Sequence, residues 1–489
     1  MNIYGFYIFL YFALSLVFTI HLAINDRSNH RVINFIIVYW YLAFNLYQSR
    51  IVLGSVPYVH YLRKADELLG YFFLMLYIML YIAGKAKDNK LIKPQKIKYE
   101  VYLIMYLLLS ILLYGLHNEL GNIGGKRAFI FSRLALSAIL IYFGVKRFMT
   151  RDLLRGIFKA TIFMGIISSF LSFIQFFIDT KVFRTGAFHN AFMSYHRSSG
   201  IFLQPYDNGL FLIFAVYTVI YTVKEKKYKI ILVMFFLLGM ILTFTRGIWI
   251  SFIFVSIFHM YYYFRNTFKR YIFVFATIIF LTILTLGTYI LQSDVFTNKA
   301  FQDRVFADTI TIRMVFYGFI IKAIPDAWAI GYGDVINNDV YFQGMVDSDQ
   351  GLYWALGRQG SIHNMFLEVA FLQGIFAMII FTMTFIYFFR FNFNESIKNR
   401  SFAYCLPNYY VMGFFFYFFS VAGFLLSRSG FLSIFMFAII GGIKSNNLDL
   451  NGITVSFKMD EFENIPILES DENNFKNSSK DSELSISEN

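Results

Sequence analysis

The chain has almost no cysteine and little proline. Its single cysteine, Cys405, lies inside an apolar run, so the chain cannot form an intramolecular disulfide or a cysteine-based metal site. Only six prolines occur among 489 residues, and this shortage together with 63 phenylalanines indicates continuous, aromatic-rich helices. Charged side chains are scarce as well, at 15% of the residues. These shortages exclude a disulfide-stapled fold.

Apolar residues take the place of the missing charge. The hydrophobic fraction is 58% and the mean hydropathy is +0.57, more than the apolar share of a soluble domain. The net charge of +13 could indicate a nucleic-acid partner, but the Lys and Arg residues cluster in short loops between apolar runs, as the positive-inside rule describes. We therefore predict an all-α integral membrane protein with about 12 to 14 transmembrane helices and no nucleic-acid partner.

The basic loops predict an orientation in the membrane. KAKDNKLIKPQKIKY at residues 85–99 is the strongest basic run, which assigns it to the cytoplasm. The N-terminal apolar run lacks the basic segment of a cleavable signal peptide and is expected to be the first membrane helix. Residues 1–444 are predicted to form one polytopic transmembrane domain. Residues 445–489 contain too few apolar residues to offset the entropy of ordering and are predicted to be a disordered cytosolic tail.

One long polar stretch interrupts the apolar runs. Residues 292–362 are predicted to be a large extracytoplasmic loop between two spans, which is where a membrane protein would assemble a site. A second outer loop is expected at residues 179–206. Residues 230–264 are long enough for two short helices, with the apex of the hairpin near TFTRG at residues 243–247.

Arg246 lies inside an otherwise apolar stretch, LLGMILTFTRGIWISFIFV. An arginine at the bilayer centre costs about 2.5 to 3.5 kcal/mol, so its presence needs a reason. One interpretation is a hairpin-turn residue whose side chain reaches the outer headgroups. The other is a cation that faces an anionic ligand in a cavity, because the guanidinium offers parallel donors to a phosphate and keeps its charge when buried.

One residue inside the large loop and one directly after it could also carry chemistry. Arg313 lies in DTITIRMVFYGFIIKAIP, which is expected to form an amphipathic helix at the outer leaflet. It fits either a solvated helix face or a second phosphate ligand. His363 directly precedes a long apolar run, so we expect it at the outer membrane face. It fits either a capping residue or a general base, since histidine is easily tuned to accept a proton near neutral pH.

The acidic residues of the loop give no clear metal site. Four aspartates could gather a divalent cation or simply keep the loop in water: Asp334, Asp339, Asp347 and Asp349. None has a clear metal-ligand spacing, and a pair of arginines could neutralise a diphosphate without a metal. No metal and no cofactor are therefore predicted. GYGD at residues 331–334 indicates a turn, and it follows no strand of a βαβ unit, so it is not a nucleotide-binding fingerprint.

Several of these segments form a recognisable series. TFTRGIW at residues 243–249 is followed by R-x-x-x-Y at Arg313 and Tyr317, which leads into PDAWAIGYGD, and then by HNMFLEVAFLQG at the start of an apolar run. In order and spacing, they resemble the motifs of the O-antigen ligase and polymerase superfamily of bacterial membrane proteins. RSSGIFLQPYDNG at residues 197–209 also resembles an upstream family segment, so that the resemblance covers about residues 195–380.

The sequence departs from the family pattern at two positions. Threonine precedes Arg246 where serine is common, and aspartate stands in PYDN where asparagine is usual. Both departures weaken the assignment to a subfamily, but neither touches the arginine or histidine positions.

The resemblance implies a fold, a substrate and roles for particular residues. The fold would be that of an integral-membrane, GT-C-like glycosyltransferase in the bacterial inner membrane, with its active site facing the periplasm or the outside. A glycan on undecaprenyl diphosphate would be the donor, and the transfer would be inverting and metal-independent. Arg246 and Arg313 would hold the diphosphate, and His363 would accept a proton from the acceptor hydroxyl or orient it. Arg197 and Asn364 would bind the donor or order the loop.

Two questions stay open at this point. The acceptor could be lipid A core, as for a ligase, another lipid-linked repeat, as for a polymerase, or a protein. The rival from another class is a non-enzymatic flippase or transporter of lipid-linked sugars, which predicts charged residues spread through several spans. Here they gather at the outer ends of a few spans, which favours an enzyme.

Overall fold

The computed structural model describes the following residues: 3–26, 28–43, 65–82, 97–123, 125–179, 182, 197–202, 204–263, 317–318, 320–333, 364–399, 402–417 and 428–448. All the elements within these ranges are helical, which confirms the predicted all-α class for this part of the chain. The helices are α1 (Ile3–Ile24), α2 (Arg31–Ala43), α4 (Ala65–Ile82), α5 (Lys98–Glu119), α6 (Gly125–Phe148), α7 (Arg151–Phe177), α8 (Pro205–Thr222), α9 (Lys226–Ile241), α10 (Arg246–Tyr263), the short 3₁₀ helix η4 (Ile324–Ala327), α16 (Met365–Asn399), α17 (Phe402–Tyr417) and α18 (Arg428–Ser445).

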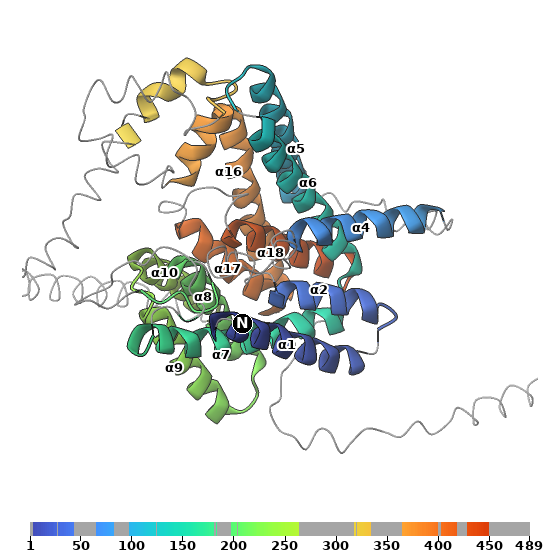
Figure 1. Ribbon diagram of the computed structural model, residues 1–489, viewed down its shortest axis with the longest axis vertical. Helices are drawn as coiled ribbons and strands as arrows, with labels where there is room; N and C mark the ends of the chain where they lie inside the picture. The colour runs from blue at the N-terminus through green and yellow to red at the C-terminus, as the bar shows by residue number, and fades with distance from the viewer. Residues whose placement is uncertain are drawn as a thin grey trace, which may run out of the picture.

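The helices pack around α17 and α18. α17 packs against α8, α10, α16 and α18, and α18 also packs against α6. Figure 1 shows α5, α6 and α16 grouped on one side of this centre, with α1, α2, α7 and α9 on another. Almost every side chain of α8 is buried, because this helix is apolar all round and is covered by α7, α9, α10 and α17.

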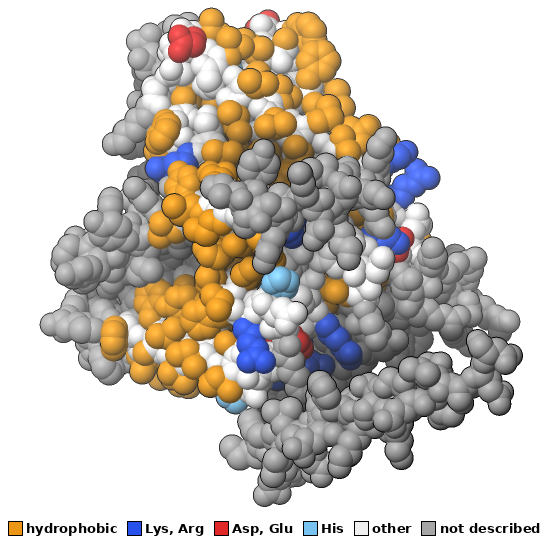
Figure 2. Space-filling model, turned by 90° about the vertical axis from the view of Figure 1, so that its right-hand side faces the viewer, with side chains coloured by type: hydrophobic (Ala, Val, Ile, Leu, Met, Phe, Trp, Pro, Cys, Tyr) orange, Lys and Arg blue, Asp and Glu red, His pale blue; other side chains and the backbone are white. Residues whose placement is uncertain are grey.

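The described helices have the length and surface of membrane spans. Within the described residues, four segments are long and apolar enough to cross a membrane: Lys98–Glu119, Ala128–Phe148, Arg151–Phe177 and Met365–Glu395. Large apolar side chains also point outward, including Leu112 at 69%, Phe129 at 64% and Met234 at 62% exposure. Figure 2 shows such side chains covering a broad, almost continuous area of one face. A surface of this kind is unfavourable in water and suits lipid. The chain is therefore an integral membrane protein.

The hairpin of α9 and α10 agrees with the prediction, and the course of α16 does not. α9 ends at Ile241 and α10 begins at Arg246, which confirms a hairpin with its apex close to residues 243–247. The expectation of continuous helices is wrong for α16, which is interrupted at Gly374 (φ 85°, ψ 170°). The break comes from glycine, so a low proline content did not exclude it. The span count, the GT-C-like class and the large loop stay predictions, because residues 264–316 and 334–363 lie outside the described residues.

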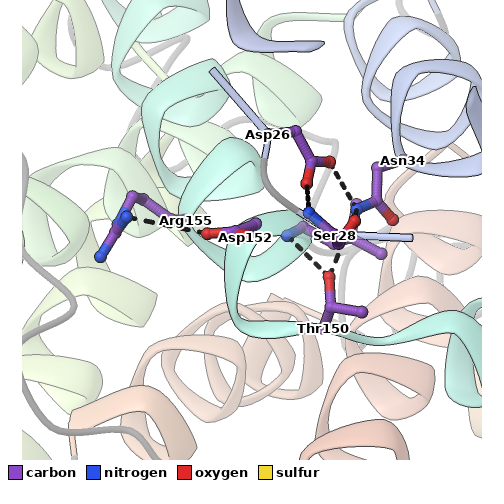
Figure 3. A network of polar contacts seen from close by, with 7 residues as sticks. Asp26, Ser28, Asn34, Thr150, Asp152 and Arg155 are labelled. Carbon is purple, nitrogen blue, oxygen red and sulfur yellow. Dashed lines mark hydrogen bonds and ion pairs between the residues drawn. The ribbon is translucent and has the colours of Figure 1, made fainter. Parts of the chain in front are cut away.

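Polar contacts tie the α1–α2 loop to the start of α7 (Figure 3). Asn34 Nδ2 donates to Asp26 Oδ2 at 2.7 Å and to Thr150 Oγ1 at 3.3 Å. The Ser28 backbone N–H donates to Asp26 Oδ1 at 2.7 Å. Thr150 is also the N-cap of α7, since its hydroxyl accepts from Leu153 N at 3.1 Å. These bonds fix the turn between α1 and α2 against α7.

Further contacts gather other basic segments in the same region. Asn446, just after α18, donates through Nδ2 to Met149 O at 2.8 Å. Lys146 at the end of α6 forms a partly buried ion pair with Glu100 of α5 at 2.6 Å. The N-terminal end of α5 and the C-terminal ends of α6 and α18 therefore meet here, together with the start of α7. The segment before α5 and the segment after α18 were predicted to face the cytoplasm, and the sidedness itself stays a prediction.

Candidate functional site

Arg246 is the first residue of α10, directly after the tight turn of residues 242–245 that joins it to α9. Within the turn, Thr245 O accepts from Ile248 N at 3.0 Å, which starts the helix. Phe244 has a positive φ of 46°, a conformation that is uncommon for a residue other than glycine. The first backbone N–H groups of a helix have no partner inside the helix and favour anions. The backbone of Arg246 therefore lies at a helix end of the kind that favours an anion.

Residues 197–200, the RSSG segment, are held to α7 by one amide side chain, that of Gln175. Its Nε2 donates to Val182 O and Gly200 O, both at 2.8 Å. Its Oε1 accepts from Ser199 N at 2.8 Å and from Gly200 N at 2.9 Å. Gln175 is fully buried, and these four bonds satisfy all its donors and acceptors. The backbone around Ser199 and Gly200 is thus fixed at the end of α7.

The segment after RSSG is anchored in a similar way. Asn208, in the first turn of α8, accepts from Ser168 Oγ at 2.7 Å and donates to Ser172 Oγ at 2.9 Å. Ser168 Oγ also accepts from Ile201 N at 3.2 Å. Asp207 beside it is buried at 3% exposure. This is the position where the family usually has asparagine, and a carboxylate there lies in the first turn of a helix, where a negative charge is favoured.

A backbone hydrogen bond joins the RSSG segment to the turn of residues 242–245 before Arg246, which we call the arginine turn. Ser198 N donates to Leu242 O at 3.1 Å. Arg197, the residue before Ser198, is partly buried with a buried Nε. The structure therefore brings the backbones that carry Arg197 and Arg246 together, although the two residues are far apart in the sequence.

A second unit forms where α16 is broken. Around Gly374 the carbonyls of Phe371 and Leu372 lose their helical partners. They accept instead from Tyr332 N at 2.7 Å and from Gly333 N at 3.0 Å. In return Ile375 N donates to Trp328 O at 2.7 Å. Residues 328–333, called the clamp segment below, therefore pair with the break and leave none of these groups unsatisfied.

The glycines of this unit are required by space as well as by conformation. Gly331, Gly333 and Gly374 all have positive φ, between 74° and 85°. A Cβ at Gly331 would lie 2.4 Å from Leu372 C, and one at Gly374 would lie 2.5 Å from Ala329 O. No other residue fits such close approaches between two backbones. The Gly-x-Gly and FLQG motifs thus form one structural unit.

Asn364 begins α16 as its N-cap. Its Oδ1 accepts from Phe366 N at 3.1 Å and from Leu367 N at 3.2 Å, and its carbonyl accepts from Glu368 N at 2.8 Å. Its side chain is therefore used to start the helix that follows the large loop. Whether it also orders the loop or contacts a donor stays a prediction.

The end of α17 contacts the start of α8, next to the RSSG segment, and the start of the broken helix α16, in both cases through aromatic rings. Tyr206, the second residue of α8, packs on Tyr417 with ring centroids 5.3 Å apart. Phe366, the second residue of α16, meets Phe415 edge-on at 5.7 Å. The starts of α8 and α16 therefore lie against the same helix end. This arrangement brings Arg197, Arg246 and Asn364 to one region of the molecule.

The other predicted residues lie outside the described part of the chain. This holds for Arg313 and His363 and for the four loop aspartates. The described backbone resumes at Asn364, the residue after His363. For Arg246 itself the structure gives the backbone, and the side chain is outside the description.

Sequence reasoning missed the buried amides that hold the site together. Gln175 and Gln373 were not singled out, although each stands alone in an apolar run. A lone polar side chain inside a membrane span is costly unless it is satisfied, so it marks a contact with a specific partner. That signal would have found both residues.

These observations define a class of protein: a helical, multi-pass membrane protein with a polar site built at the helix ends. Residues 231–382 match a protein-family model described as O-antigen ligase. The match confirms the resemblance predicted from the motifs, although the RSSG segment lies outside the matched residues. The comparison with curated proteins gave no match. The family match supports a glycosyltransferase-like enzyme of cell-surface polysaccharide biosynthesis that uses lipid-linked glycans in the membrane.

Proposed function

We propose that the protein transfers a glycan from undecaprenyl diphosphate to an acceptor at the outer face of the bacterial cytoplasmic membrane. The observation that carries this proposal is the hydrogen bond from Ser198 N to Leu242 O, which joins the segments of two arginines at the start of α10. Arginines gathered at a helix N-terminus suit a diphosphate, because the guanidinium fork and the helix end both donate to phosphate oxygens. The family match supports the same substrate class.

The chemistry is a single displacement at the anomeric carbon. The acceptor oxygen forms a bond to this carbon on one face, while the bond to the diphosphate oxygen breaks on the other face. The electron pair leaves with the diphosphate, whose growing charge Arg246 and Arg313 stabilise. The acceptor hydroxyl loses its proton to His363. Because the leaving group is a stable anion, the step needs no strong general acid, and one displacement inverts the anomeric configuration.

Asn364 and Arg197 support this arrangement in different ways. Asn364 caps α16 and so fixes the backbone directly after His363. Arg197 is anchored beside the arginine turn and would bind a second part of the donor. The acceptor is lipid A core, another lipid-linked glycan or a protein, and the described residues favour none of the three.

The direct test is a transfer assay with the purified protein and a synthetic undecaprenyl diphosphate glycan. Arg246→Ala should lower the rate about a hundred- to a thousandfold, the usual cost of removing one preorganised donor to a developing anion. Arg246→Lys keeps the charge but loses the paired donors, so its rate should lie between that of the wild type and that of Arg246→Ala.

Arg155→Ala is the matched control. Arg155 lies in the first turns of α7, pairs only loosely with Asp152 at 3.7 Å, and is remote from the arginine turn along the chain. Its removal should leave transfer unchanged. Full transfer by Arg246→Ala would show that Arg246 only holds the hairpin turn at the outer headgroups. Movement of the donor across liposome membranes without any transfer would favour the flippase instead.

A further inference from the structure

One face of α5 contacts both parts of the unit at the α16 break. Ser110, Tyr114 and His117 are spaced so that they line one side of the helix. All three are buried. α5 lies outside the matched residues 231–382, so the family match says nothing about it.

Two of these residues bind the last side chain before the break. Ser110 Oγ donates to Gln373 Oε1 at 3.0 Å, and Gln373 Nε2 donates to Tyr114 Oη at 2.9 Å. Gln373 is 3% exposed and directly precedes Gly374. Its amide is therefore fixed from both ends at the point where the helix loses its own hydrogen bonds.

The third residue binds the clamp segment. His117 Nε2 lies 2.8 Å from Ile330 O, and the carbonyl can only accept, so Nε2 carries the proton. The other ring nitrogen then accepts from Asn122 Nδ2 at 3.3 Å. Gly333 lies so close to the ring that a Cβ there would be 2.6 Å from His117 Cγ. α5 thus holds both polypeptide segments that meet at the break.

We infer that this face of α5 positions the half-helix of residues 365–373, and with it the His363 that precedes it. The inference rests on the proposed role of His363 as the base. A half-helix of nine residues is about 14 Å long. A change of about 4° at Gly374 would therefore move its start by about 1 Å, and a misplacement of that size can cost a factor of about a hundred in rate. Tyr114 and Gln373 are positioning residues in this account.

A double variant separates positioning from plain stability. Tyr114→Phe removes only the hydroxyl and keeps the ring that stacks on Phe131 at 4.4 Å, but it leaves the Gln373 amide without its acceptor. Adding Gln373→Leu removes the orphaned amide, and replacing both partners of a buried hydrogen bond by apolar groups is close to neutral for stability. Ser110 Oγ, which loses Gln373 Oε1 as an acceptor, still donates to Tyr106 O at 2.9 Å. The double variant should therefore keep its thermal midpoint while kcat falls about ten- to a hundredfold. The KM for the donor should be unchanged, because the arginines bind the diphosphate.

Tyr102→Phe is the control. Tyr102 belongs to the same helix and stacks on Tyr387, beyond the break, with ring centroids 5.0 Å apart. Tyr102→Phe removes a tyrosine hydroxyl from the same pair of helices, but it does not touch the half-helix before the break. We therefore expect kcat to stay unchanged. Wild-type rates in the double variant would overturn the inference.

A second measurement does not depend on activity. Hydrogen exchange of the amides of residues 366–373 should speed up in the double variant, while the amides of residues 376–395 keep their protection. Unchanged exchange in the first half would overturn the inference even if the variant were inactive. If the wild-type protein showed no transfer at all, the proposed function would fail, and the exchange experiment would still decide whether α5 sets the half-helix.

Discussion

At the scale of single residues, the site depends on groups that leave no room for substitution. Gly200 is the clearest case, because its φ is +57° and a Cβ there would lie 2.1 Å from Ser168 Oγ and 2.9 Å from Ser168 O. The same hydroxyl accepts from Ile201 N and donates to Asn208, so it cannot move freely.

Gly200→Ala should therefore lower the free energy of unfolding by about 2 to 5 kcal/mol, as the sum of backbone strain and overpacking. Gly121→Ala isolates the first contribution, because Gly121 also has a positive φ, 73°, but nothing lies within 4 Å of a Cβ there. It should cost only about 1 to 2 kcal/mol. Thermal denaturation in detergent measures both, and equal losses would contradict the packing described around Ser168.

At the scale of elements, the broken helix α16 is the feature that organises the second half of the site. Gly374→Ala would force a Cβ to within 2.5 Å of Ala329 O and 2.8 Å of Trp328 O, in a conformation that L residues rarely adopt. Both contacts are with backbone, which cannot turn away.

We expect Gly374→Ala to release the clamp segment and to reduce transfer by at least about tenfold, because the start of α16 is then held less firmly. The protein should also denature at a lower temperature. Gly115→Ala in α5 is the counterpart, since nothing lies within 4 Å of its Cβ. An alanine there should be neutral or stabilise by up to about 1 kcal/mol. Normal activity and stability in Gly374→Ala would show that the break does not need a glycine.

The same element shows where sequence reasoning succeeds and where it stops. The turn before Arg246 was predictable, because a charged residue interrupts an apolar run that is too long for one helix. The break in α16 was not, because FLEVAFLQGIFAMII is apolar apart from Glu368 and Gln373, and a glycine alone does not stop a membrane helix. Its cause is the pairing with the clamp segment, a contact between backbones that leaves no pattern in either segment. Both glycine motifs were visible, but their contact was not.

At the scale of the whole molecule, the proposed site requires that the large loop and the cytosolic segments lie on opposite sides of the membrane. The described contacts gather the start of α5 and the ends of α6 and α18 in one region, as expected for segments on one side. A reporter that is active only outside should be active when fused at Asp347. It should be inactive when fused at Lys93 or after Asp471. An inactive fusion at Asp347 would overturn both the topology and the location of the site.

The central claim is that His363 serves as the base while the arginines hold the donor. The measurement that tests it most directly is transfer and donor binding by His363→Ala, assayed on the same preparation. We predict that transfer falls at least a hundredfold, within the usual range of about a hundred to ten thousand for a general base. Donor affinity should stay close to that of the wild type. His189→Ala, which alters the other His-Asn dipeptide of the chain, should retain most of the activity. A loss of less than about tenfold in His363→Ala would contradict the claim.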